Sequence, residues 1–174
     1  MSTNQNTIKP KAPKIQEIVE SSKSLIMATV DADGNPVSSY APYVYLNGKF
    51  MVYVSFMAKH TKNLRDRKKV SVMLIEDESD SKQIYARTRL TINAEATHIE
   101  NTNPLFEQTI NALQERHGKV VEVLSEMTDF ILFELTPKNG AYVNGFGSAY
   151  FVDANLQALE QNTGEQGGHG HGSK

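Results

Sequence analysis

The chain of 174 residues contains no cysteine. Without thiols there can be no disulfide, no thiolate metal site and no cysteine nucleophile, so histidine and carboxylate side chains must carry any metal chemistry. An excess of positive charge is also missing, because 18 Lys and Arg face 20 Asp and Glu, which gives a net charge of -2 and a pI near 6.2. Nucleic acid and membrane surfaces are attracted by a basic field. We therefore expect neither as a partner.

Long apolar runs are absent as well. No stretch approaches the length that spans a membrane, and the polar segment from Met1 to Pro13 has no apolar core of a signal peptide. We expect a cytoplasmic protein without membrane insertion. The length suits one well-buried domain, which we interpret as a flexible N-terminal arm over residues 1–13, a folded domain over 14–153 and a C-terminal tail over 154–174.

What the sequence does contain is a succession of short β patterns with a few helices. Asn47-Gly48 is the dipeptide preferred in a two-residue hairpin, so the strand ending at Leu46 should fold back onto the next one. Helical spacing is expected over 15–23, 59–68, 104–118 and 120–127. Extended segments are expected over 24–30, 37–46, 50–56, 70–75, 84–99, 130–135 and 142–152. The glycines of the last one can mark bulges or the close approach of another backbone. This pattern predicts a mainly β (α+β) fold, an antiparallel β-barrel, closed or split, of six to seven strands with covering helices.

The tail carries the first functional lead. Residues 164–174 are mostly glycine and polar, yet they include His169 and His171 in a Gly-His-Gly-His run. A segment so poor in apolar side chains cannot order itself by burial, so these imidazoles are either solvated or held by something that they bind. A disordered tail, a cloning scar and a divalent-metal-binding tail are the alternatives.

Several strings in the domain together resemble the split-barrel superfamily of pyridoxamine 5′-phosphate oxidase, and more closely its HutZ/HugZ-type haem-utilisation branch. Examples are Met27-Ala28-Thr29-Val30-Asp31 and Ala58-Lys59-His60-Thr61. The strings lie in order at 27–31, 39–43, 58–64, 70–78, 86–91, 129–133 and 143–150. The resemblance thus covers residues 24 to 152, nearly the whole domain.

This resemblance implies a homodimer of split barrels that binds haem b near the dimer interface. It further implies that a histidine of the C-terminal segment is the axial ligand of the iron, a role open here to His169 or His171. Members of this branch open the haem ring by oxidation, which gives a biliverdin-type product, releases iron and requires an external electron donor. We therefore expect a haem oxygenase.

Two further positions are implied by the same resemblance. Asp129 matches a carboxylate that accepts a hydrogen bond from the ligand histidine, although an aspartate before a strand is equally a good turn residue. Arg89 matches an arginine of the haem pocket, where it would pair with a propionate or steady iron-bound oxygen. A cross-strand ion pair is the alternative for Arg89, and it is the favoured reading for Arg87.

Lys59 and His60 bear on the choice of cofactor. Flavin-binding members grip the flavin phosphate with two adjacent basic residues after a hydroxyl, whereas this chain has Ala58-Lys59-His60. A largely neutral imidazole serves a phosphate less well than a permanent cation, so FMN is the less favoured cofactor. His60 is also compatible with an ordinary barrel-end position, and His98 and His117 have ordinary explanations at a strand end and a helix end. The rival functions are a haem carrier or store without turnover, an FMN-dependent oxidoreductase, and a metal-binding tail on a structural barrel.

Overall fold

The computed structural model describes residues 11–161. Four α-helices, one 3₁₀ turn and eight strands follow one another in these residues. The helices are α1 (Ile15–Ser21), α2 (Lys59–Arg67), α3 (Pro104–His117) and α4 (Val120–Glu126), and the 3₁₀ turn is Ile84–Ala86. The strands are β1 (Ser24–Val30), β2 (Pro36–Leu46), β3 (Lys49–Ser55), β4 (Lys69–Ile75), β5 (Arg89–Ile99), β6 (Phe130–Val143), β7 (Ala149–Val152) and β8 (Ala158–Gln161).

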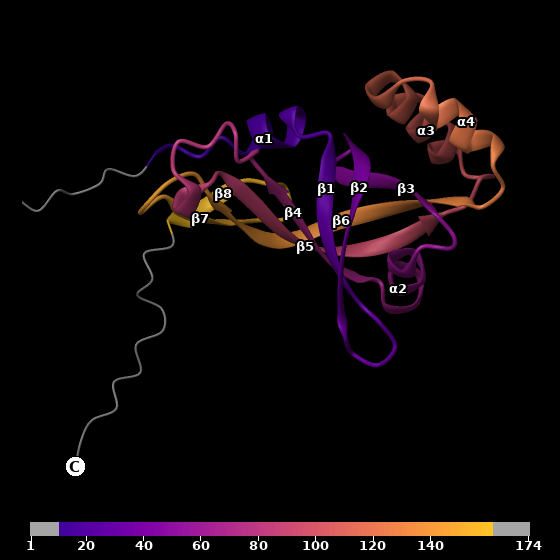
Figure 1. The fold of residues 1–174 in the computed structure, drawn as a ribbon, viewed down its shortest axis with the longest axis horizontal. Helices are drawn as coiled ribbons and strands as arrows, with labels where there is room; N and C mark the ends of the chain where they lie inside the picture. Colours follow the sequence, from indigo (N-terminus) through magenta and orange to yellow (C-terminus); the bar gives the residue numbers. More distant parts are fainter. Residues whose placement is uncertain (1–10, 162–174) are drawn as a thin grey trace, which may run out of the picture.

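All eight strands belong to one antiparallel sheet in the order β3-β2-β1-β4-β5-β6-β7-β8. An additional pairing of β3 with β6 closes the first six strands into a barrel, while β7 and β8 continue the sheet beyond it. Figure 1 shows β7 and β8 at one end of the elongated molecule and α2, α3 and α4 at the other. The predicted antiparallel split barrel is confirmed, with the short edge strand β8 in addition to the strands expected.

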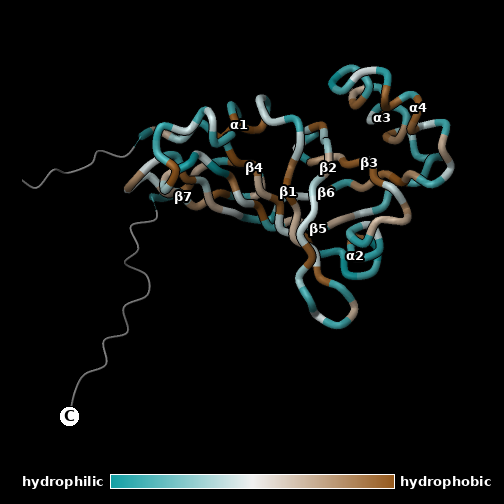
Figure 2. The backbone as a smooth tube through the Cα atoms, in the orientation of Figure 1, coloured by the Kyte–Doolittle hydropathy of each residue, from teal (hydrophilic) through white to brown (hydrophobic). Residues whose placement is uncertain are grey.

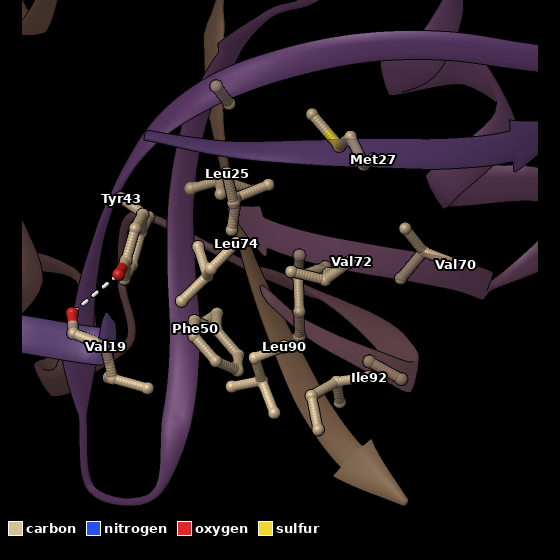
Figure 3. Close-up of a cluster of buried hydrophobic side chains, with 14 of the residues drawn as sticks. Val19, Leu25, Met27, Tyr43, Phe50, Val70, Val72, Leu74, Leu90 and Ile92 are labelled. Atoms are coloured by element: carbon tan, nitrogen blue, oxygen red, sulfur yellow. Dashed lines mark hydrogen bonds between the residues drawn. The ribbon is translucent and has the colours of Figure 1, made fainter. Parts of the chain in front are cut away.

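The barrel core follows from the alternation of side chains along each strand. Leu25 and Met27 of β1 are fully buried, and their neighbours in sequence point outward. Figure 3 shows how these side chains meet apolar residues of β4 and β5, among them Leu74 and Leu90. The Tyr43 hydroxyl donates a 2.6 Å hydrogen bond to the Val19 carbonyl, which fastens α1 over the end of the barrel.

The β2–β3 hairpin confirms the turn expected at Asn47-Gly48. Both residues have positive φ, 53° for Asn47 and 78° for Gly48. Only glycine and a few short polar residues adopt this backbone readily, and it matches the twist of the flanking strands. The turn therefore fixes the register in which Leu46 faces Lys49.

A second apolar cluster lies outside the barrel, where α3 and α4 cover the sheet. Leu113 of α3 and Val121 of α4 pack with Met51 and Leu132, which come from β3 and β6. The side chain of Asn103 accepts the Leu105 amide and caps α3, and Pro104 follows as its first residue. In Figure 2 brown alternates with white and teal along the strands, while α2 is mostly teal, as expected for a charged helix on the surface.

The expectation of one strand over 84–99 is wrong in its first part. Residues 84–86 form the 3₁₀ turn, and β5 begins only at Arg89. The local reason is side-chain chemistry: Gln83 accepts the Tyr85 amide, and Glu76 accepts the Thr88 amide at 2.7 Å. These bonds hold the backbone in a turn, and the alternation of buried and outward side chains begins only at Leu90.

The expected boundary between the extended segments over 130–135 and 142–152 is also wrong. β6 runs without interruption from Phe130 to Val143, and the glycines 145 and 147 form the turn to β7 rather than bulges within a strand. Gly140 is instead the position of close approach, since a Cβ atom there would lie 2.1 Å from the Thr91 carbonyl oxygen. A glycine in this strand thus allows β5 and β6 to pack closely.

The boundaries of the domain are marked by contacts of both terminal segments. The amide of Lys11 donates to the Ser148 hydroxyl, and the Tyr150 hydroxyl donates to the Lys11 carbonyl. Leu156 is buried in the barrel core, beyond the expected end of the domain at 153. Lys11 and Leu156, which lie outside the expected bounds 14–153, therefore contact the folded domain. Within 11–161, no helix combines the length and the apolar character needed to cross a membrane.

Candidate functional site

Arg89 is the first residue of β5 and lies at the β7 end of the sheet. It pairs with Ile75 of β4 and with Val143, the last residue of β6. Its side chain is half-buried, and one guanidinium nitrogen donates to the Arg87 carbonyl at 3.2 Å. That single bond leaves most donors of the guanidinium for a carboxylate or another acceptor.

Arg87 is held differently, although it is only two residues away. Its guanidinium donates to the Glu76 carbonyl and lies 3.4 Å from a carboxylate oxygen of Glu78. The acidic segment after β4 therefore wraps around Arg87. Arg87 is thus engaged within its own subunit, whereas Arg89 keeps free donor capacity among the described residues.

Asp129 directly precedes β6 and lies close to the end of β3. Its carbonyl accepts the Phe56 amide, and its carboxylate lies 3.5 Å from the Ser55 hydroxyl. The carboxylate is half-buried and held by only that long contact, so it can accept a further hydrogen bond. Burial raises the pKa of Tyr53, and the negative charge of Asp129 raises it further.

Lys59 and His60 form the first turn of α2 and point in different directions. Lys59 is exposed and lies 3.9 Å from Asp31, a separation at which an ion pair contributes little. His60 is half-buried, and its Nε2 atom is buried without a hydrogen-bond partner among residues 11–161. Burial lowers the pKa of His60. Its imidazole is therefore biased toward the neutral form, and the two side chains do not form a pair of cations.

The remaining described histidines have partners within the fold. Nδ1 of His98 lies 3.2 Å from Glu100, and its ring packs on Phe133 with centroids 5.7 Å apart. Nε2 of His117 lies 2.9 Å from the Tyr43 carbonyl oxygen. Within residues 11–161 no three His, Asp or Glu side chains gather in a way that could hold a metal ion. His169 and His171 lie outside the described residues.

The predicted site residues fall into two groups at opposite ends of one subunit. Arg89 is paired with the last residue of β6, and Asp129 precedes its first residue, so the whole 14-residue strand separates them. At about 3.3 Å per residue, the path along this strand is about 45 Å. Lys59 and His60 belong to the Asp129 group, because the Ser55 carbonyl, next to Phe56, accepts the Thr61 hydroxyl of α2. One subunit does not bring the two groups together.

A large groove at the Arg89 end was not foreseen from the sequence. Its volume is about 920 Å³, and it is lined by residues of α1, the N-terminal segment and the β4–β5 connection, including Lys14, Glu76, Asp80, Thr88, Tyr142 and Asn144. The Lys14 amide donates to the Tyr142 hydroxyl at 3.3 Å, and the Asn144 amide group donates to the Ala12 carbonyl. These two contacts join segments about 130 residues apart in the chain, so no local sequence pattern predicts them.

Comparison with known proteins agrees with this architecture. Residues 12–144 match the family described as pyridoxamine 5′-phosphate oxidase. The chain is 44% identical over 140 residues to the haem oxygenase HutZ of Vibrio cholerae, which covers 80% of each protein. Among solved structures, the HutZ haem storage protein of Vibrio cholerae has a TM-score of 0.69 and 43% identity over 71% of this chain and 87% of that one. Campylobacter jejuni ChuZ has a TM-score of 0.78 and 28% identity over 91% of this chain and 65% of that one.

Proposed function

This chain belongs to the pyridoxamine 5′-phosphate oxidase family, in the branch that contains HutZ, and we propose that it binds haem b and opens the porphyrin ring to release iron. The observation that carries this proposal is the 44% identity to a haem oxygenase over 80% of both chains. The family match over residues 12–144 spans the six barrel strands and both ends of β6, where Arg89 and Asp129 lie. When bound, haem supplies the oxidative chemistry, and the protein positions it and controls its surroundings.

The axial ligand in this proposal is His169 or His171. Strand β8 ends at Gln161, which pairs with Tyr150 of β7, and Tyr150 in turn pairs with Tyr142 of β6, the partner of Leu90 next to Arg89. His169 is the eighth residue after Gln161, so even a fully extended chain could place it at most about 28 Å from the end of β8. Imidazole is the common nitrogen ligand of haem iron, and both histidines belong to a Gly-His-Gly-His run without apolar side chains.

Arg89 and Asp129 take supporting roles. The free donors of Arg89 suit a propionate carboxylate, which a guanidinium binds in a bidentate fashion. Asp129 acts as a positioning residue: its carboxylate accepts the second N–H of the ligand imidazole, which fixes the ring and strengthens its donation to iron. The half-buried settings of both side chains support these roles, because they limit competition from water.

The outer face of the sheet supports a homodimer. One row of laterally paired positions crosses six strands and contains no charged side chain: Tyr40, Ile26, Met73, Thr91, Ala141 and Phe151. Several of them are exposed in the single subunit, Tyr40 to 69%, Ile26 to 40% and Phe151 to 43%. An uncharged, mostly apolar and partly exposed row of this kind is typical of a face that another protein covers.

Dimerisation also explains why the site residues are divided. Arg89 is two residues before Thr91 and therefore lies on the same outer face as the uncharged row. If two copies pack on that face about a two-fold axis that reverses the strands, the β6 start of one subunit approaches the β7 end of the other. Each haem would then lie between Arg89 of one subunit and Asp129 of its partner.

Haem storage without turnover is the second candidate, because the solved HutZ structure is described as a haem storage protein. Storage and degradation can use the same ligand, and electron supply distinguishes them. Flavin binding is less well supported, since Lys59 is exposed beside Asp31 and His60 turns inward. Two adjacent cations for a flavin phosphate are not offered there.

A hemin titration followed by turnover tests the proposal. The protein should bind hemin stoichiometrically with a shifted Soret band, and ascorbate in air should then bleach that band and yield a biliverdin-type spectrum with free iron. Catalase is included so that peroxide bleaching is excluded. A stable Soret band under these conditions would assign storage, and no binding of hemin together with a retained flavin would reject both haem functions.

A further inference from the structure

We infer that the turn between β3 and α2, with the outer face of α2, docks an acidic protein that donates electrons one at a time. This inference rests on the proposed function, since only haem turnover needs such a donor. The surface consists of Phe56, Met57, Lys59, Lys62 and Arg65 and is called the α2 surface below. Its charge, its apolar centre and its position next to Asp129 each support this role.

The charge of this segment opposes that of the chain. The protein carries a net charge of -2, yet residues 59–69 contain six Lys and Arg against the single carboxylate of Asp66. Asp66 is shared by two cations, at 2.7 Å from Lys62 and 3.3 Å from Arg65, and Lys59 lies 3.9 Å from Asp31. The two carboxylates of Asp66 and Asp31 do not neutralise six cations. A local positive field remains, which would steer an acidic partner.

The centre of the same surface is apolar and exposed. Met57 is 82% exposed and Phe56 is 49% exposed, although both are large apolar side chains. The guanidinium of Arg65 lies over the Phe56 ring, 5.2 Å from its centroid, so the cationic rim touches the apolar centre. An apolar centre with a polar rim is the usual anatomy of a protein interface, and electron-transfer encounters use small ones.

The α2 surface is joined to the Asp129 end of the candidate site. The Phe56 amide donates to the Asp129 carbonyl, and Ser55 pairs with Phe130, the residue after Asp129. Lys59 and Lys62 lie on the solvent side of α2, while Thr61 and Leu64 face the protein. A protein docked on Phe56 and Met57 would therefore be separated from Asp129 by the β3 end alone.

The reaction at each encounter is a single electron transfer. The reduced donor loses one electron, ferric haem gains it and becomes ferrous, and the donor leaves in its one-electron-oxidised form. Repeated turnover needs a complex that forms and dissociates quickly. Long-range attraction between a basic and an acidic surface provides a high association rate without a large buried area.

The test compares a protein donor with a small one on matched variants. Flavodoxin, an acidic one-electron flavoprotein, is the probe, and ascorbate is the small reductant. In Lys62→Gln/Arg65→Gln the rate constant for reduction of bound ferric haem by reduced flavodoxin should fall about tenfold at low ionic strength, as expected when steering is lost. The rate with ascorbate should not change. The control Lys23→Gln/Lys82→Gln removes two exposed lysines elsewhere and should behave as the wild type.

Salt and the apolar centre provide the second readout. High ionic strength should slow the wild type toward the rate of the double variant, because it screens the same charges. Phe56→Ser should weaken association at every salt concentration. The inference would be overturned if reduced flavodoxin reduced the haem of the wild type and of Lys62→Gln/Arg65→Gln at the same rate. It would also be overturned if the control Lys23→Gln/Lys82→Gln slowed by the same factor. Binding to vesicles of anionic lipid but not to flavodoxin would overturn it as well.

Failure of this inference can be told from failure of the proposed function. Binding of flavodoxin to the haem-free protein, followed by titration calorimetry, tests docking without any haem. Hemin binding and ascorbate-driven turnover test the function without any docking. If flavodoxin does not bind but ascorbate still drives turnover, the inference alone is rejected. If flavodoxin binds but no turnover occurs with ascorbate, the proposed function is rejected.

Discussion

Arg89 and Asp129 lie at opposite ends of the same strand path, because Arg89 pairs with Val143 and Asp129 immediately precedes Phe130. Both match positions that the family resemblance places around one haem. One subunit does not bring the two residues together, and in the dimer that we propose they would come from different subunits. The mixed-dimer prediction depends on this relationship.

Mixed dimers test whether the site is shared. Arg89→Gln and Asp129→Asn homodimers should each lose most of their turnover. After the two variants are mixed and subunits exchange, half of the dimers are mixed and one of their two sites is intact, so activity should return to about one quarter of wild type. Steady-state release of biliverdin measures it. If both residues act within one subunit, mixing restores nothing.

The tail histidines should determine the spectrum of the bound haem. Replacing both His169 and His171 with alanine should weaken hemin binding and shift the ferric Soret band, because the iron loses its nitrogen ligand. Asp129→Ala should leave binding largely intact but alter the spectrum or turnover, since it acts through the ligand. His98→Ala is the control, because His98 already pairs with Glu100. Identical spectra in all three variants would refute the assignment.

His60 should make the fold sensitive to acid. Burial lowers its pKa from 6.5, so the unfolded chain takes up a proton at a higher pH than the folded chain. The free energy of unfolding should therefore fall as the pH drops below 6.5, and His60→Leu should reduce that fall. Urea unfolding of the apoprotein at pH 7.5 and pH 5 measures it, with His98→Gln as the control. An unchanged pH dependence in His60→Leu would contradict this prediction.

Tyr43 should define an alkaline limit of stability. Burial raises its pKa from 10.0 to about 12, although the charge of Arg116 opposes the shift. Between these values the unfolded chain ionises first, so stability is complete below pH 10 and is lost toward pH 12. Tyr43→Phe should lose about 1 kcal/mol at neutral pH, because the Val19 carbonyl loses its partner, and should show a smaller alkaline loss. Denaturant unfolding at pH 7, 10 and 11 distinguishes the two effects.

Gly140 should tolerate no side chain. An added Cβ would lie 2.1 Å from the Thr91 carbonyl and 2.6 Å from the Ile92 side chain, so β5 and β6 would have to separate. We expect Gly140→Ala to cost about 3 kcal/mol, the upper range for overpacking. Gly118→Ala meets nothing within 4 Å and is penalised only by its backbone conformation, φ 84° and ψ -164°, so it should cost less, about 1 to 2 kcal/mol. Equal melting temperatures for the two variants would be inconsistent with this close approach.

Local chemistry made much of the barrel predictable. Asn47-Gly48 correctly predicted the β2–β3 hairpin. The buried face of β5 was predicted by the alternation of Leu90, Ile92, Ala94 and Ala96. The division of residues 84–88 from β5 was not predictable in the same way. It depends on the Glu76 and Gln83 side chains, and whether they bond to the backbone is decided only when the chain has folded.

The sequence by itself determined the kind of chemistry: no thiols, two histidines in a glycine-rich tail, and strings of a haem-utilisation family spread over one domain. These follow from residue identity, which folding does not alter. Only the tertiary structure decided that Arg89 and Asp129 lie far apart in one subunit, and that an uncharged row crosses six strands beside Arg89. Distances across a sheet depend on register and closure, which arise from contacts between segments distant in the chain.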